Sequence, residues 1–221
     1  MGIGEFVSES FGYANESLFG KWVRWIILII CSIIFPLMMG YSLRIMRGIT
    51  PAPDPGEYVR MLIDGIKVIL INIVYMIIPL IIGGAVLVLT GGIGSLTMLG
   101  MDVSNPWAYM GLFMASFGLA FLVFFIVAFI FSLFGIIGVV RFARTGSMGE
   151  AFAFNEITQT VGKIGWVQYI LALIVLCIIL FVISMVLGMI PVIGGILNLI
   201  IAPYLSILIA RYYSQLYDAG S

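Results

Sequence analysis

The stretch Arg44-Ile-Met-Arg47-Gly48 closes a long apolar run, and the chain repeats it further on as Arg141-Phe-Ala-Arg144-Thr-Gly146. Each copy is followed by a helix-start signal, a short helix with a charged face and a second apolar run. The apolar runs reach the ~20 residues that an α-helix needs to span the ~30 Å apolar core of a bilayer. The repeated stretch therefore indicates a membrane protein made of two related halves, with arginine pairs at the ends of its spans.

The composition supports this class. Hydrophobic residues make up 63% of the 221 residues and charged residues 9%, whereas soluble domains carry about 45–50% and about 25%. The net charge is zero, so no overall field favours nucleic acid. The chain has no histidine, and its two cysteines lie in separate apolar runs, so we expect no metal site and no cofactor.

The spacing of the runs predicts an all-α fold with about five transmembrane helices in two parallel repeats and with interfacial amphipathic helices. We expect Pro36 to kink the first span. The predicted spans lie at about 22–43, 68–89, 110–140, 164–189 and 196–210. The whole chain, 1–221, is predicted to be one membrane domain, divided into an interfacial N-terminal helix (1–20), a first repeat (21–90), a second repeat (107–189) and a last span (190–213).

The N-terminal segment 3–19 places apolar residues at a helical spacing, with acidic residues between them. This pattern is typical of an amphipathic helix on a membrane surface. It equally fits a lead-in helix that packs against the rest of the protein, and both interpretations stay open here.

Helix-start signals follow each arginine pair. Asp54, followed by Pro55 and by Glu57 three residues on, predicts a capping box, and Ser147 with Glu150 predicts a second one. After the first box, four residues of alternating charge share one helix face and can form local pairs. These residues are Glu57, Arg60, Asp64 and Lys67.

The distribution of Lys and Arg predicts the orientation. Eight of the ten lie in the segments 44–67 and 141–163 and at Arg211, and only Lys21 and Arg24 lie elsewhere. The positive-inside rule makes the eight-residue side cytoplasmic. With five spans in the cell membrane, the N-terminus is outside and the C-terminus cytoplasmic. If the first run fails to cross, the N-terminus returns to the cytoplasm.

The predicted spans contain no obvious catalytic chemistry. No Walker loop, catalytic dyad or metal-ligand cluster is present, so we expect no enzyme. The intramembrane amides Asn72, Gln168 and Asn198 are the most costly polar groups to leave unpaired, so we expect them to face protein. Hydrogen bonding between helices is one interpretation, and a path for a small solute or ion is the other.

The arginine pairs are the remaining candidate site. Arg44 with Arg47, and Arg141 with Arg144, are three residues apart and share a helix face. They can serve as anchors at the headgroup level, or they can form a specific site for an anionic headgroup or a partner protein. The leading hypothesis is a non-enzymatic module that binds membrane lipid or a partner, or self-assembles, through its cytoplasmic face. The alternative is a channel or facilitator.

Several motifs are distinctive together: Phe11-Gly-Tyr13, Gly40-Tyr41, Asp64-Gly65-Ile-Lys67 and the run from Arg141 to Ile157. With them, roughly residues 11–213 resemble an uncharacterised prokaryotic membrane family catalogued as a domain of unknown function and abundant in methanogenic archaea. A fainter similarity is to the membrane region of some glycerophosphodiester phosphodiesterases. The resemblance implies an archaeal cell-membrane protein, but it supplies no activity and no site residues.

Overall fold

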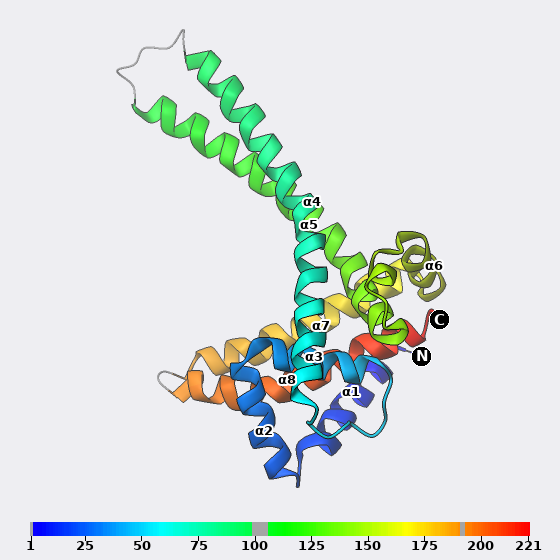
Figure 1. The fold of residues 1–221 in the computed structure, drawn as a ribbon. Coiled ribbons are helices and arrows are strands. Elements are labelled where there is room, and N and C mark those ends of the chain that lie inside the picture. The colour runs from blue at the N-terminus through cyan, green and yellow to red at the C-terminus, as the bar shows by residue number, and fades with distance from the viewer. Residues whose placement is uncertain (1, 99–105, 191–192) are drawn as a thin grey trace. The chain divides into compact units, whose positions relative to one another are not determined.

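The computed structural model of the chain describes residues 2–98, 106–190 and 193–221, and throughout these ranges the regular structure is helical (Figure 1). The all-α prediction is thus confirmed. The elements are α1 (Ile3–Leu18), α2 (Trp22–Ile33), α3 (Phe35–Met46), α4 (Tyr58–Met98), α5 (Pro106–Thr145), the 3-10 helix η1 (Met148–Phe152), α6 (Phe154–Ile164), α7 (Trp166–Gly188) and α8 (Ile193–Asp218).

Within the described ranges, four helices are long and apolar enough to cross a membrane. They are Tyr58–Gly91, Phe113–Thr145, Trp166–Gly188 and Ile193–Asp218. They overlap the second to fifth of the predicted spans. The short charged helix predicted before the second span is continuous with it, as the first turns of α4.

The first predicted span is not one helix. It is broken at Ile34 into α2 and α3, each of 12 residues, and Pro36 lies in the first turn of α3. Proline lacks the N–H that would continue the helix, and it also disfavours the helical conformation of the residue before it. The expected kink is therefore a full break, and five predicted spans become four long helices and a broken pair.

The chain forms two compact units. The first contains residues 1–71 and 136–221, and the second contains residues 72–135. Both boundaries fall inside the long helices α4 and α5, so the units do not coincide with the predicted repeats. In the second unit the two helices pack through Gly83 against Phe124 and through Tyr75 against Gly135.

Helix α8 organises the first unit. It packs against α1, α2, α3 and α7, as Figure 1 shows. The ring of Phe6 meets that of Tyr212 edge-on at a centroid distance of 6.0 Å, and the Tyr212 hydroxyl donates to the Ala172 carbonyl at 2.7 Å. Of the two interpretations of segment 3–19, the structure supports the packed helix, because α1 buries Phe6, Ala14 and Leu18.

Helix α3 crosses the start of α4 with the two backbones in direct contact. A Cβ atom at Gly40 would overlap the Met61 carbonyl, and one at Gly65 would overlap the Pro36 carbonyl. Two glycines at the crossing are what permit this approach. The crossing fixes how the arginines at the end of α3 meet the charged face of α4.

The proline-rich segment between α3 and α4 differs from its prediction. Asp54 is not an N-cap, since α4 begins at Tyr58 and the Asp54 carboxylate instead forms an ion pair with Arg24. Buried tyrosines hold the segment. The Tyr13 hydroxyl donates to the Ile49 carbonyl at 2.8 Å, and burial raises the pKa of Tyr13 to about 12, so this hydroxyl keeps its proton at neutral pH.

The second predicted capping box also differs. Ser147 precedes η1, but its side chain makes no capping hydrogen bond. Helix α6 then buries Ile157 and Val161, which the sequence placed on its apolar side. In both copies the acidic residue of the predicted box instead forms an ion pair with an arginine: Glu57 with Arg44 and Glu150 with Arg141.

Candidate anion-binding cleft

Both arginine motifs form the ends of helices. The first ends α3 and the second ends α5, and each is followed by a glycine with positive φ, 82° at Gly48 and 74° at Gly146. Glycine adopts this conformation without strain and commonly ends helices. Basic side chains are also favoured there, because the helix C-terminus carries a partial negative charge.

The first arginine of each motif bonds to an equivalent glutamate. Arg44 Nη2 lies 3.2 Å from Glu57 Oε2, and Arg141 Nη2 lies 2.7 Å from Glu150 Oε2. Glu57 and Glu150 are the acidic residues of the two predicted capping boxes. The two copies of the sequence repeat therefore share one structural feature, an Arg–Glu ion pair that closes the turn after the helix.

The second arginines have different partners. Arg47 pairs with Asp64 at 2.6 Å, whereas Arg144 pairs with Asp218 at 2.6 Å and donates to the Ser214 hydroxyl at 2.9 Å. The Arg144 guanidinium also lies against Gly48, where a Cβ atom would come within 2.6 Å of Nη1. The two motifs thus meet in the first unit.

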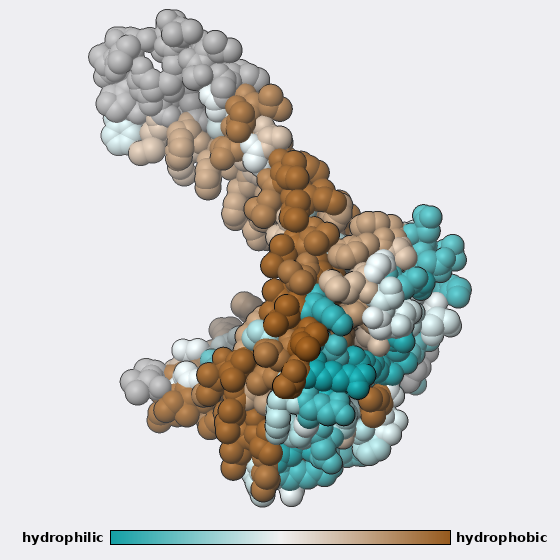
Figure 2. Space-filling model, in the orientation of Figure 1, coloured by the Kyte–Doolittle hydropathy of each residue, from teal (hydrophilic) through white to brown (hydrophobic). Residues whose placement is uncertain are grey.

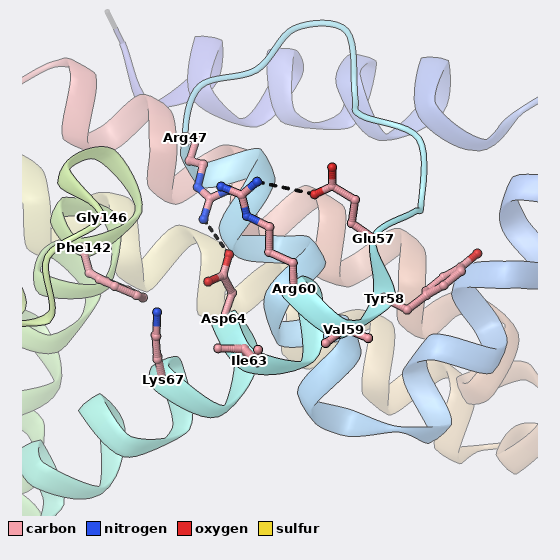
Figure 3. A pocket seen from close by; sticks show the side chains of 10 residues that line it. All are labelled: Arg47, Glu57, Tyr58, Val59, Arg60, Ile63, Asp64, Lys67, Phe142 and Gly146. Carbon is pink, nitrogen blue, oxygen red and sulfur yellow. Dashed lines mark hydrogen bonds and ion pairs between the residues drawn. The ribbon is translucent and has the colours of Figure 1, made fainter.

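A cleft of about 640 Å³ lies where the first motif, the start of α4 and the second motif come together (Figure 3). Its lining consists of a charged face of α4, apolar side chains beside that face, and two residues of the second motif. The lining residues are Arg47, Glu57, Tyr58, Val59, Arg60, Ile63, Asp64, Lys67, Phe142 and Gly146.

The cleft contains more positive than negative side chains. It holds three cations but only two carboxylates, and Asp64 is already bound to Arg47. Arg60 approaches Glu57 only to 3.5 Å, and its side chain is 66% exposed. Lys67 forms no ion pair within the described ranges, and Figure 3 shows its ammonium group directed into the space near Asp64 and Phe142.

The cleft also exposes apolar surface. Tyr58, Val59 and Ile63 are all exposed, with Val59 at 74%. Ammonium and guanidinium groups bind phosphate oxygens through charge-assisted hydrogen bonds. Cations beside exposed apolar side chains match an amphiphilic anion, one with a phosphate group and a hydrocarbon chain.

Of the four arginines predicted as site residues, Arg47 lines the cleft. Arg44, Arg141 and Arg144 are bound to carboxylates beside it. The remaining cations of the cleft are Lys67, which forms no ion pair within the described ranges, and Arg60, whose only ion pair there is the exposed one with Glu57. The sequence indicated both only as members of local pairs. The steps of three and four residues between the charges predicted that both lie on one face of α4. The sequence did not predict that Lys67 would form no ion pair within the described ranges.

The two intramembrane amides of the first unit, Gln168 and Asn198, are not brought together. Asn72 belongs to the second unit, whereas Gln168 is in the first turn of α7 and Asn198 is near the start of α8, at the opposite end of that helix pair. Asn72 and Asn198 are exposed in the single chain, and the expectation that they face protein stays a prediction. Asn198 lies about 8 Å from the end of α8, so its amide can reach the interface.

In the part of the chain that the structure describes, no group of three or more His, Cys, Asp or Glu side chains could hold a metal ion. Cys31 is buried, Cys177 is exposed, and neither forms a disulfide.

The apolar helices and the charged turns between them define a multi-pass membrane protein. The chain belongs to the family described as "Protein of unknown function (DUF4013)", whose model matches residues 25–192, a range that includes both arginine motifs and the cleft. The predicted resemblance to a family of unknown function is confirmed. The archaeal source and the phosphodiesterase similarity stay predictions. No curated protein and no solved structure matches the chain.

Proposed function

We propose that the protein is a non-enzymatic membrane module that binds the phosphate headgroups of anionic lipids through the cleft at its cytoplasmic face. One observation carries the proposal: the ammonium group of Lys67, which forms no ion pair within the described ranges, and the exposed Arg60, held only by a solvent-exposed pair with Glu57, line a cleft with exposed apolar walls. A headgroup phosphate fits the charged part and an acyl chain fits the apolar part.

The positive-inside rule supports a cytoplasmic location for the cleft. The segments that form it, and the C-terminal end of α8 beside it, carry eight of the ten Lys and Arg. The inner leaflet is also where anionic lipids attract basic residues near the membrane, at about 1 kcal/mol for each Lys or Arg.

The four motif arginines have a different role in this proposal. Because each is bound to a carboxylate, we assign them to holding the turns and the cleft in place, and only Arg47 lies close enough to share a ligand. Replacing all four would therefore disturb the fold as well as binding. The informative variant is one that removes only the exposed cations.

The test measures lipid binding to the purified full chain by native mass spectrometry, with phosphatidylglycerol and phosphatidylcholine of the same acyl chains. We expect the native chain to prefer phosphatidylglycerol. The double variant Arg60→Gln/Lys67→Gln should lose about 2 kcal/mol of that preference, which is roughly thirtyfold. Lys163→Gln is the matched control, because Lys163 is an exposed cation on α6 outside the cleft.

Equal losses in the double variant and in Lys163→Gln would mean that binding follows bulk charge, and the cleft would be rejected as the site. Competition by inorganic phosphate at millimolar concentration would point to a free anion as the ligand. Recovery of a dimer whose population falls in the double variant would favour self-assembly through the same surface.

A further inference from the structure

The charged side chains in and beside the cleft fall into two groups of the same composition. Each group contains an arginine at the end of α3, a carboxylate in or just before the first turns of α4, and a cation three residues after that carboxylate. The outer triad consists of Arg44, Glu57 and Arg60, and the inner triad consists of Arg47, Asp64 and Lys67. With two cations and one carboxylate, each triad has a net charge of +1.

The two triads are two helical turns apart. Arg60 and Lys67 are separated by seven residues, which correspond to a rise of about 10 Å and a rotation of only about 20°. Arg60 is directed toward the start of α4, where its Nη1 lies 3.5 Å from Glu57 Oε2. Lys67 is directed the same way, with its ammonium group near Asp64 in Figure 3. Because the charged ends stay apart, one phosphate, which binds cations at about 2.7–2.9 Å, cannot bond to both.

The inner triad lies at the apolar end of this arrangement. The Asp64 side chain is 10% exposed, against 65% for that of Glu57 in the outer triad. Lys67 is the last formal charge of α4, and the sequence holds none from there to Asp102. Figure 2 shows the hydrophilic colour at the start of α4 giving way to the hydrophobic colour further along the helix. A lipid in the cleft would therefore place its acyl chains beyond Lys67 and the outer part of its headgroup near Arg60.

An apolar stripe runs beside the charged face of α4. Four exposed side chains, spaced four, three and four residues apart, share one side of the helix, about a quarter turn from the charges. They are Val59, Ile63, Ile66 and Leu70. An acyl chain attached near Lys67 can lie along Ile66 and Leu70, which belong to the helix that is long and apolar enough to span.

Glu57 has a backbone conformation that is unusual for its residue type. Its φ of 52° lies in the left-handed region, which costs free energy for residues other than glycine. Such conformations persist where the surrounding structure holds them, and they cluster at ligand sites. Both arginines of the outer triad approach the same oxygen, Glu57 Oε2, and a carboxylate has further acceptor positions. Glu57 can therefore accept a hydrogen bond from a hydroxyl group while its charge stays paired.

We infer that the lipid bound in the cleft carries two phosphates separated by a polyol ring. The inner triad binds the diester phosphate that bears the acyl chains, the outer triad binds a second phosphate on the ring, and Glu57 accepts from the ring hydroxyls. The two phosphates of a diphosphate share an oxygen and are too close together to occupy both positions. The inference rests on the proposed function and names its lipid class, of which phosphatidylinositol 4-phosphate is an example.

The test compares phosphatidylinositol with phosphatidylinositol 4-phosphate, with the same acyl chains, by native mass spectrometry of the purified full chain. We expect the native chain to bind the 4-phosphate more tightly. Arg60→Gln should reduce the ratio of the two affinities by roughly fivefold, the effect of one cation, and Arg60→Lys should retain more of the ratio because it keeps the charge. Lys67→Gln should weaken both lipids by the same factor. Lys163→Gln, outside the cleft, is the control and should leave the ratio unchanged.

An equal loss for both lipids in Arg60→Gln would overturn the assignment of two phosphate positions, while the cleft would remain a site for anionic lipid. If the native chain bound neither phosphatidylinositol nor phosphatidylglycerol in preference to phosphatidylcholine, the proposed function would fail and the inference with it. Displacement of both lipids by an equal concentration of soluble inositol 1,4-bisphosphate would identify a soluble ligand and overturn the lipid class.

Discussion

Arginine serves two purposes in this protein, and burial decides between them. The side chains of Arg44 and Arg141 are nearly enclosed, so an unpaired charge there would carry a large desolvation penalty, and each has a carboxylate beside it. Arg60 is mostly exposed to solvent, where its ion pair with Glu57 contributes little. The enclosed arginines therefore stabilise the turns, while the exposed cation remains free to meet a ligand.

The Arg47–Asp64 pair gives a quantitative test of this division. Arg47→Gln or Asp64→Asn alone should destabilise the protein by about 2 kcal/mol, because each leaves a partly buried charge without its partner. The double variant should recover part of this loss, with a coupling energy of at least about 1 kcal/mol. Thermal unfolding in detergent, followed by near-UV circular dichroism, measures it.

The matched control is the exposed pair Arg60–Glu57, at 3.5 Å. Its coupling should stay below about 0.5 kcal/mol, since exposed pairs contribute little. If the two pairs had equal coupling energies, burial would not be what separates structural from ligand-binding cations.

The sequence pattern predicted the positions of these arginines but not which carboxylates they bind. The repeat identified the motifs and also the two glutamates, because Glu57 and Glu150 recur at the same place in both copies. Asp218 lies 74 positions from Arg144, and nothing in the local pattern connects them. Long-range partners depend on how the helices pack, which periodicity does not specify.

At the scale of the elements, the crossing of α3 over α4 depends on two glycines. Gly40→Ala and Gly65→Ala should each destabilise the protein by about 1–3 kcal/mol, because the added methyl group overlaps a backbone carbonyl that cannot move alone. Gly12→Ala in α1 is the control. Its Cβ atom meets nothing within 4 Å, so this variant should be neutral or more stable by up to about 1 kcal/mol.

Thermal unfolding of the three variants under one condition provides the comparison. A loss in Gly12→Ala as large as in Gly40→Ala would show that the crossing has no special role. Because the crossing positions Arg47 beside α4, we also expect Gly65→Ala to weaken binding of phosphatidylglycerol.

Element boundaries were predicted well where hydrophobic runs define them and poorly where turns do. The apolar runs located α4, α5, α7 and α8. The sequence predicted that the helix starts at Asp54, since aspartate is a common N-cap, but α4 begins at Tyr58 and the Asp54 carboxylate binds Arg24 of α2. Pro36 was recognised as a disturbance, but whether a proline kinks or breaks a helix depends on what packs around it.

At the scale of the whole molecule, the charges divide into internal pairs and an exposed set, and salt should affect the two differently. The screening length falls from about 8 Å at 0.15 M to about 3 Å at 1 M, and partly buried pairs are screened least. Raising the salt concentration should therefore change the unfolding temperature of the lipid-free protein little while weakening the binding of anionic lipid.

The expected result is a change in ligand-induced stabilisation. Phosphatidylglycerol at a hundred times its Kd should stabilise the native chain by about 2.7 kcal/mol, which raises Tm by roughly 5–10 °C for a protein of this size. At 1 M salt most of this increase should disappear, and Arg60→Gln/Lys67→Gln should lack most of it even at low salt. If high salt lowered Tm equally with and without lipid, the salt-sensitive charges would be those that hold the fold together, and the exposed cations would not be the binding groups.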